Sequence, residues 1–301
     1  MTMTERSDVV ASTIRTVEGG GGMALHVREW GPPSGHPMLL IHGWSGNHLC
    51  WNRQVNSGLA KDFRLVAVDL RGHGMSDHPL NSAAYVDRRL WAADVAAVIE
   101  QCELDRPTLV GWSYGGFVIC DYVREHGQDR IAAVNFVGAA VTLNADFDHI
   151  GPAFLSNAPG GADLDLPTRI AALRRFWHAM TAKQLEPEDL ETGLSGSVAV
   201  PPQVLGALIS RQIDSDDVLS QLSVPVLVSQ GRDDQIIMPS MADHILHMCP
   251  AAQASWYDAV GHAPFVEDPK RFNAELAELA RPVVGRPNRS GAVPDRRRGR
   301  H

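Results

Sequence analysis

The chain has 301 residues and a formal net charge of −8 at pH 7, with 44% hydrophobic and 21% charged residues. A chain of this length can bury a sizeable core and suits one large domain with an insertion. The negative net charge argues against a nucleic-acid-binding domain, and no apolar run is long enough to span a bilayer. The first eight residues lack the apolar stretch of a signal peptide, and the four cysteines are widely spaced. We therefore expect a cytoplasmic protein with reduced cysteines and with neither a membrane nor a nucleic acid as partner.

The N-terminal part predicts a β-hairpin, two buried strands and a helix. Residues 1–12 are expected to form a flexible arm. The alternating segments 13–18 and 23–30 flank four consecutive glycines, a pattern typical of a hairpin. The aliphatic runs 37–41 and 63–69 then indicate buried strands of a parallel sheet. A helix should follow, with four side chains on one apolar face: Trp91, Val95, Val98 and Cys102.

A tight turn between a strand and a helix is the most informative stretch. The run 107–110 predicts a buried strand and 117–123 a buried helix, with Gly111-Trp112-Ser113-Tyr114-Gly115-Gly116 between them. This is Gly-x-Ser-x-Gly in the context of a nucleophile elbow, where any Cβ at the flanking glycines would clash with the neighbouring strand and helix. Ser113 is the predicted nucleophile, and the backbone N–H of Tyr114 a predicted donor to an oxyanion. Taken alone, such a motif is more often a glycine-rich loop than a catalytic turn.

The middle of the chain interrupts the alternation of strands and helices. After an apolar strand at 131–140, residues 141–222 hold six prolines and only short helical stretches. The run is too long for a loop and too irregular for one crossover, so we predict an inserted helical cap. Ordinary sheet helices in a longer chain are the alternative. Apolar residues in this region would form either a substrate pocket or the cap's own core: Phe154, Leu155, Phe176, Trp177 and Met180.

Regular alternation returns in the last part of the chain. Strands are predicted at 224–229 and near 254–257, a helix at 240–247, and a final helix that begins at Asp268 and Pro269. This order predicts an α/β fold with a mostly parallel sheet that is covered by helices on both faces. The predicted organisation is a flexible arm, a core in two parts, a cap and a disordered basic tail: 1–12, 13–140 with 223–282, 141–222, and 283–301.

A serine nucleophile needs a base, and the base needs a carboxylate that fixes its tautomer. His262 follows the last strand on a Gly-His turn, at the sheet edge where the elbow should lie. Its alternative is a structural histidine, the usual role of any one of the 13 histidines. Asp234 ends the preceding strand. Asp233 competes with it, and the spacing to Gly231 and Pro239 favours Asp234.

The sequence His42-Gly43-Trp44 should lie beside the elbow, at the end of a central strand. Its loop is expected to supply the second oxyanion donor, the backbone N–H of Trp44. Loss of one such donor costs on the order of 3 kcal/mol in the transition state. Trp44 could instead be a packing aromatic that covers the pocket, and both roles can hold together.

In order, these motifs resemble those of the α/β-hydrolase superfamily over about residues 13–282. The motifs are His42-Gly43-Trp44, Arg71-Gly72-His73-Gly74-Met75-Ser76-Asp77, Gly111-Trp112-Ser113-Tyr114-Gly115-Gly116, Gly231-Arg232-Asp233-Asp234 and Gly261-His262. They are most similar to bacterial esterases and to the cofactor-free haloperoxidase (perhydrolase) branch. The resemblance implies a cap inserted after the sixth strand and a mainly structural role for residues 71–77.

The resemblance and the triad together imply a serine hydrolase that cleaves a carboxylic ester of a small molecule through an acyl-enzyme. The ester should carry an apolar acyl or aryl group, and activity should fall as His262 becomes protonated. Perhydrolysis, carbon–carbon hydrolysis and a slow-turnover ligand-binding receptor stay open as alternatives. Related dehalogenases and epoxide hydrolases carry aspartate at the elbow, unlike Ser113. Related cofactor-free dioxygenases place their acid after the sixth strand, where Asn135-Phe136-Val137-Gly138 has no carboxylate.

No cofactor or metal is expected from the sequence. His244, His247 and Cys249 are close together on a predicted helix, but nothing nearby supplies further ligands. No glycine-rich nucleotide-binding motif follows a strand.

Overall fold

The computed structural model describes residues 11–144 and 146–281. Its centre is an eight-stranded sheet in the order β1-β2-β4-β3-β5-β6-β7-β8. The strands are β1 (Ser12–Gly19), β2 (Met23–Trp30), β3 (His36–Ile41), β4 (Phe63–Val68), β5 (Thr108–Trp112), β6 (Ala133–Val137), β7 (Val226–Gly231) and β8 (Ala252–Tyr257). The pairs β1–β2 and β2–β4 are antiparallel and all others are parallel. The predicted mostly parallel α/β sheet is therefore confirmed.

The local sequence accounts for these strands. Every residue of β5 and β6 is buried, as expected for aliphatic strands in the middle of a parallel sheet. The β1–β2 hairpin pairs Gly19 with Met23 across the glycine turn, which confirms the predicted hairpin. Most of the predicted arm (1–10) and the whole predicted tail (283–301) lie outside the described residues, and Ser12 already belongs to β1.

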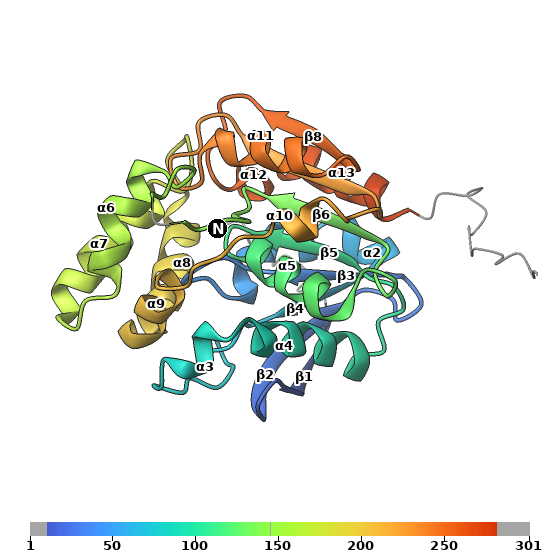
Figure 1. Ribbon diagram of the computed structural model, residues 1–301, viewed down its shortest axis with the longest axis horizontal. Helices are drawn as coiled ribbons and strands as arrows, with labels where there is room; N and C mark the ends of the chain where they lie inside the picture. The colour runs from blue at the N-terminus through green and yellow to red at the C-terminus, as the bar shows by residue number, and fades with distance from the viewer. Residues whose placement is uncertain (1–10, 145, 282–301) are drawn as a thin grey trace, which may run out of the picture.

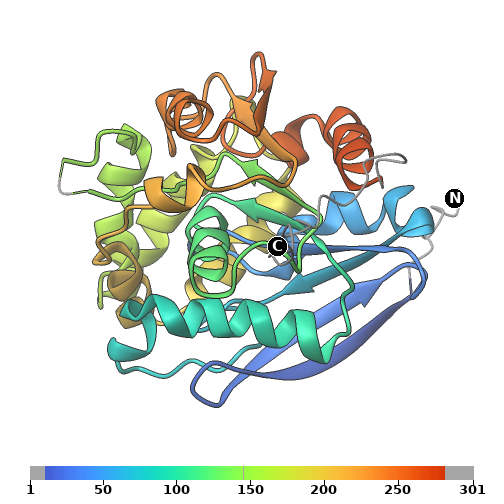
Figure 2. The same cartoon turned by 45° about the vertical axis from the view of Figure 1, so that its right-hand side comes forward.

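Helices cover both faces of the sheet (Figures 1 and 2). Helices α4 and α5 pack against each other on one face, and α1, α12 and α13 lie together on the other. These and the remaining short helices are η1 (His48–Trp51), α1 (Asn52–Val55), α2 (Leu59–Asp62), α3 (Ala83–Val86), α4 (Arg88–Gln101), α5 (Gly115–His126), α11 (Pro239–Met248), α12 (Pro264–Glu267) and α13 (Pro269–Ala280). The four apolar residues predicted on one face of α4 are all buried.

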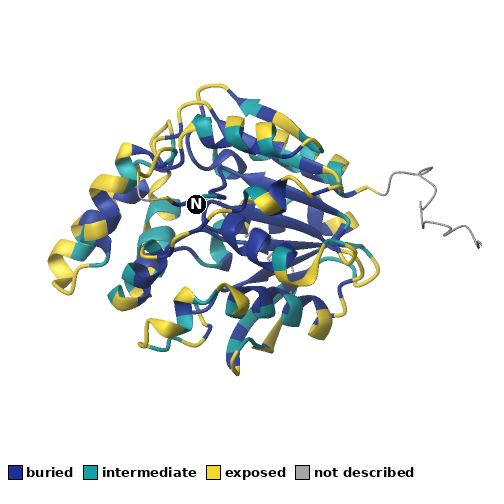
Figure 3. Cartoon of the chain, in the orientation of Figure 1, coloured by how far each residue is buried: buried dark blue, intermediate teal, exposed yellow. Residues whose placement is uncertain are grey.

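Five helices lie between β6 and β7: α6 (Pro152–Gly161), α7 (Leu166–His178), α8 (Pro187–Ala199), α9 (Pro202–Ile209) and α10 (Asp216–Leu219). The first four gather beyond one end of the sheet, at the left of Figure 1, with exposed outer faces and buried inner faces in Figure 3. Within the described ranges no single helix is long and apolar enough to cross a membrane. Helices α8 and α9 reach that length and composition only as a pair, bent by 90°.

The turn after β4 is built around a buried arginine. Arg71 is 1% exposed, and its guanidinium donates to both carboxylate oxygens of Asp94 at 2.7 Å. It also donates to the carbonyl oxygens of Gly20, Ala84 and Leu90. A buried side chain in which each guanidinium nitrogen donates to a group inside the protein supports the structural role implied for this motif.

Candidate active site

Ser113 lies at the sharp turn between β5 and α5. Its φ of 55° is in the left-handed region, which a residue with a side chain rarely adopts. A Cβ at Gly115 would lie 2.6 Å from the carbonyl oxygen of Ile41 in β3, and one at Gly111 would lie 2.7 Å from the carbonyl oxygen of Gly115. Both glycines are therefore needed for the close approach of strand and helix, and this geometry is that of a nucleophile elbow.

Asp234 and His262 meet at the same edge of the sheet, from the ends of β7 and β8. Nδ1 of His262 lies 2.8 Å from Oδ2 of Asp234, and both residues are 1% exposed. Asp233, the competing acid, is exposed. The other carboxylate oxygen of Asp234 accepts backbone hydrogen bonds from Ile236 at 2.8 Å and from Ile237 at 3.0 Å. The carboxylate is thus fixed where it can orient the imidazole.

The second nitrogen of His262, the buried Nε2 atom, has no hydrogen-bond partner among the described residues. No hydrogen bond joins it to Oγ of Ser113, which is 8% exposed at the same edge. Such bonds are often long without substrate and tighten when substrate binds. The structure therefore brings Asp234 and His262 into direct contact and leaves both Nε2 and Ser113 unengaged.

Backbone contacts with the cap hold the His262 loop. The backbone N–H of His262 donates to the carbonyl oxygen of Met180 at 2.7 Å, in the segment between α7 and α8. Glu267 accepts hydrogen bonds from the backbone N–H of Gly261 at 2.7 Å and of Ala182 at 2.9 Å. Burial raises the pKa of the Glu267 carboxyl. These contacts could not be predicted from the sequence, because Met180 and Glu267 belong to no motif.

The two backbone N–H groups predicted to form the oxyanion hole, those of Trp44 and Tyr114, have no acceptor among the described residues. Tyr114 is the N-cap residue of α5, so its N–H has the orientation and the favourable dipole of a helix N-terminus. Both predicted donors are therefore available, and an oxyanion bound there would satisfy two groups that are otherwise unpaired.

Aromatic side chains of the cap pack over this edge. The Trp44 ring is 3% exposed and meets Phe154 and Phe176 edge-on at centroid distances of 5.4 and 5.2 Å. Its Nε1 donates to the carbonyl oxygen of Leu205 at 3.2 Å, so the side chain of Trp44 does pack as a covering aromatic. Leu155 is 43% exposed, so the prediction that it belongs to a pocket or to the cap core is wrong. It lies on the outer face of α6.

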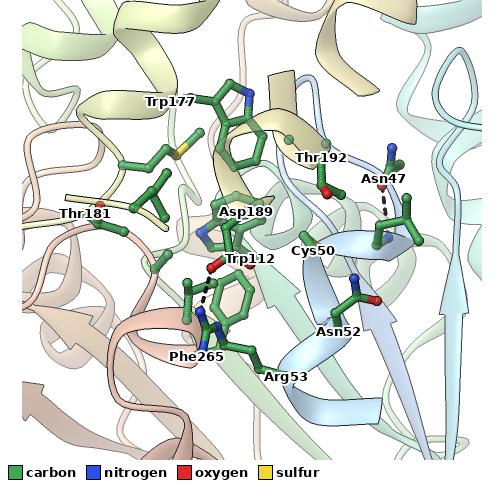
Figure 4. Close-up of a pocket in the computed structure, with 17 residues that line it drawn as sticks. Asn47, Cys50, Asn52, Arg53, Trp112, Trp177, Thr181, Asp189, Thr192 and Phe265 are labelled. Carbon is green, nitrogen blue, oxygen red and sulfur yellow. Dashed lines mark hydrogen bonds and ion pairs between the residues drawn. The ribbon is translucent and has the colours of Figure 1, made fainter. Parts of the chain in front are cut away.

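A neighbouring pocket lies between η1, α8 and α12 (Figure 4). Its cavity volume is about 50 Å³. Trp112, Trp177 and Phe265 are among its walls, and the ion pair between Arg53 and Asp189 crosses it at 2.5 Å. None of the three predicted catalytic residues lines this pocket. Trp112 contacts the site directly, because its Nε1 donates to the carbonyl oxygen of His262 at 3.0 Å.

The histidines on α11 do not converge on a shared site. Nε2 of His244 lies 2.7 Å from a carboxylate oxygen of Asp216, and its ring stacks on that of His149. His247 is exposed and Cys249 is buried. All four cysteines of the chain are free.

Comparisons with known proteins agree with this fold. A family model described as alpha/beta hydrolase fold matches residues 36–269. The structure of esterase RhEst1 from Rhodococcus sp. ECU1013 is similar with a TM-score of 0.83 and 37% identity, covering 89% of this chain and 98% of that one. The structure of a putative aryl esterase from Burkholderia cenocepacia is similar with a TM-score of 0.84 and 31% identity, covering 89% of this chain and 97% of that one. A non-heme chloroperoxidase of Streptomyces lividans is 27% identical over 87% of this chain and 97% of its own. The chain therefore belongs to the α/β-hydrolase fold family.

Proposed function

We propose that the protein is a serine hydrolase that cleaves carboxylic esters through an acyl-enzyme. The observation that carries the proposal is the buried pair of Asp234 and His262, 2.8 Å apart, whose free Nε2 lies at the sheet edge that presents Ser113 on a left-handed turn. A serine hydroxyl is a weak nucleophile at neutral pH, and this arrangement supplies the base that it needs. The esterases among the similar structures support the same assignment.

Acylation begins when Oγ of Ser113 attacks the ester carbonyl carbon and Nε2 of His262 takes the hydroxyl proton. Asp234 stabilises the imidazolium that forms and keeps the other proton on Nδ1. The carbonyl oxygen becomes an oxyanion and accepts hydrogen bonds from the N–H groups of Trp44 and Tyr114. Collapse of the tetrahedral intermediate breaks the ester C–O bond, and His262 gives its proton to the departing alcohol.

Deacylation repeats the sequence with water as the nucleophile. His262 takes a proton from water, the hydroxide oxygen bonds to the acyl carbon, and the same two N–H groups hold the oxyanion. The bond to Oγ of Ser113 then breaks, and His262 returns its proton to the serine. The products are a carboxylic acid and an alcohol, and the enzyme ends in its starting protonation state.

The walls of the site favour an apolar acyl or aryl group. Trp44, Phe154 and Phe176 form an edge-on aromatic cluster between the cap and the oxyanion loop. Such a cluster excludes water and packs against flat or aliphatic groups. Small esters of aryl alcohols or of short aliphatic acids are therefore the substrates to examine first.

Hydrolysis of p-nitrophenyl acetate and butyrate by the full chain tests the proposal. We expect multiple turnover by the wild type and loss of activity in Ser113→Ala. Ser195→Ala is the matched control, because Ser195 lies exposed on α8 and its hydroxyl bonds only within its own helix. Hydrolysis that persists in Ser113→Ala would contradict the proposal. Turnover that stops after one equivalent would favour the receptor alternative.

Perhydrolysis is a second candidate, and the similarity to a non-heme chloroperoxidase favours it. Hydrogen peroxide would attack the same acyl-enzyme in place of water, so the product would be a peracid and no metal would be required. Peracid formation from acetate and peroxide should then depend on Ser113 to the same degree as ester hydrolysis does.

The chain has no carboxylate after β6, where the related dioxygenases place their acid. The residue after β6 is Gly138, and a Cβ there would lie 3.1 Å from Nδ1 of His262 and 3.4 Å from Oδ2 of Asp234. A carboxylate-bearing side chain does not fit at this position while Asp234 occupies its place after β7. This packing argues for the hydrolytic arrangement.

A further inference from the structure

A second cluster of histidines and a carboxylate lies apart from the proposed triad, one strand beyond the oxyanion loop. His26 comes from β2, His48 begins η1, and Asp69 follows the last residue of β4. One ring nitrogen of each histidine and one carboxylate oxygen of Asp69 lie within 4.8 Å of one another. The three residues are 43 positions apart from first to last, and no sequence motif joins them.

We propose that His26, His48 and Asp69 form a binding site for one divalent transition-metal ion, best suited to Zn²⁺. Two imidazoles and one carboxylate are ligands that zinc and its neighbours Co²⁺ and Ni²⁺ accept, whereas Ca²⁺ and Mg²⁺ prefer oxygen ligands alone. Three protein ligands leave a fourth position for water. The site is independent of the proposed hydrolase chemistry.

Two of the ligands lie close to the separation that a metal requires and would have to move apart by about 0.4–0.5 Å. Nδ1 of His48 is 2.9 and 3.0 Å from the two oxygens of Asp69. Ligand bonds of about 2.1 Å at tetrahedral angles place ligand atoms about 3.4 Å apart. The ion would therefore replace the proton between Nδ1 of His48 and Asp69, and the neutral ring would carry its proton on Nε2 instead.

The carboxylate is held in place by other groups. The backbone N–H of His48 donates to Oδ1 of Asp69 at 2.7 Å, and that of Met75 donates to Oδ2 at 2.9 Å. Asp69 is 0% exposed. Backbone donors of this kind orient a ligating carboxylate and are the usual outer partners of metal ligands in proteins.

His26 is the third ligand of the site, and its partly exposed ring lies where the ion would enter from solvent. Its ring makes no hydrogen bond to the described residues and is only partly buried, so it can turn the short distance toward the other two ligands. Its backbone is fixed, because its carbonyl oxygen accepts a hydrogen bond from the Asp69 N–H at 2.8 Å.

The chain offers a matched control in a second pair of close histidines. His149 and His244 stack at a centroid distance of 5.3 Å, and Asp216 lies beside them. In that cluster Nδ1 of His149 is 3.0 Å from the hydroxyl of Ser240, and Nε2 of His244 is 2.7 Å from Asp216. Unlike the His26 ring, the His149 ring already has a side-chain partner at Nδ1, so this cluster should not bind the ion.

Titration of the tag-free, chelator-treated full chain with Co²⁺ and Zn²⁺ tests the site. We expect one equivalent bound by calorimetry, visible d–d absorption with Co²⁺, and a higher melting temperature with Zn²⁺. His26→Ala should weaken binding at least tenfold and remove the absorption, and so should His26→Gln, which keeps a polar side chain of similar size. His149→Ala should behave as the wild type.

Three results would overturn the site. The first is a wild type that shows no visible absorption with Co²⁺. The second is unchanged affinity in a folded His26→Ala or His26→Gln protein. The third is an equal loss in His149→Ala, which would mean that scattered surface histidines bind the ion.

Discussion

The two oxygens of the Asp234 carboxylate have different partners. Oδ1 accepts hydrogen bonds from the backbone N–H groups of Ile236 and Ile237. Oδ2 accepts a hydrogen bond from the side-chain amide of Gln230 and lies within hydrogen-bond distance of Nδ1 of His262. Three of these partners are N–H groups that can only donate, so both oxygens of the carboxylate act as acceptors. The proposed role of Asp234 follows: it forces the His262 proton onto Nδ1 and leaves a lone pair on Nε2 for Ser113.

Asp234→Asn should reduce kcat by a factor on the order of 10⁴. The asparagine oxygen would keep the two backbone donors, so its NH₂ group would face His262 and favour the tautomer with the proton on Nε2. That tautomer cannot accept the Ser113 proton. Steady-state kinetics of ester hydrolysis measure the effect. The control is Asp233→Asn, which should retain activity because Asp233 is exposed. Equal losses in the two variants would contradict this role.

At the residue scale, the sequence predicts the candidate residues that follow strands but not the contacts that are made through backbone groups. Ser113, Asp234 and His262 each follow a strand in a glycine-containing turn, and such turns are local patterns. The contacts of Met180 and Glu267 with the His262 loop are made to backbone N–H and C=O groups, which every residue carries. Only the folded chain shows which of those groups meet.

At the scale of elements, one arginine joins the end of the cap to the helix that follows the elbow. Arg211, just after α9, donates to Asp121 on α5 at 2.6 Å and to the hydroxyl of Tyr114 at 3.0 Å. The guanidinium also lies over the Trp91 ring of α4. Arg211 and Asp121 are 5% and 1% exposed. Burial raises the pKa of Asp121 to about 6 in spite of the opposing effect of Arg211, so the pair matters most above that pH.

Arg211→Met should lower the free energy of unfolding by about 3–5 kcal/mol at pH 8, because it leaves the Asp121 carboxylate buried without its counter-charge. The double variant Arg211→Met with Asp121→Leu should recover most of that loss, since it removes both charges. Urea unfolding of the wild type and both variants measures this. A double variant no more stable than the single one would show that packing, not charge pairing, sets the cost.

The cap shows why the sequence predicts that an insertion is present but does not predict where its helices begin or how they pack. Its prolines suggested irregularity, but Pro152, Pro187 and Pro202 are each the first residue of a helix, α6, α8 and α9. Proline is favoured there because the first N–H of a helix has no partner within the helix. How those helices lie over the site depends on contacts such as that of Arg211 with Asp121, 90 residues away in the sequence, which no local pattern contains.

At the scale of the whole molecule, buried neutral histidines make the fold sensitive to acid. Burial lowers the pKa of His42 to about 4 and that of His73 to about 3. In the unfolded chain a histidine has its ordinary pKa of about 6.5. Below that pH these two histidines bind protons in the unfolded chain but not in the folded protein. Their contribution to the free energy of unfolding is therefore fully present above about pH 6.5 and decreases as the pH falls.

Each of these two histidines should lower the free energy of unfolding by up to about 1.4 kcal/mol per pH unit, between about pH 6.5 and its folded pKa. Urea unfolding at a series of pH values from 8 to 5 measures the slope. His73→Asn removes one of the two groups while keeping a side chain that can donate to the Arg71 carbonyl oxygen. Its slope should be shallower, and an unchanged slope would show that other groups cause the acid sensitivity.

The central claim is that the fold assembles an activated Ser113, and the mass of the intact protein after exposure to a fluorophosphonate tests it most directly. Oγ of an activated serine displaces fluoride from phosphorus, so the wild type should gain one phosphonyl group and Ser113→Ala should gain none. That result would establish the nucleophile before any substrate is known. A folded wild type that stays unmodified, or a Ser113→Ala protein that is modified equally, would contradict the account.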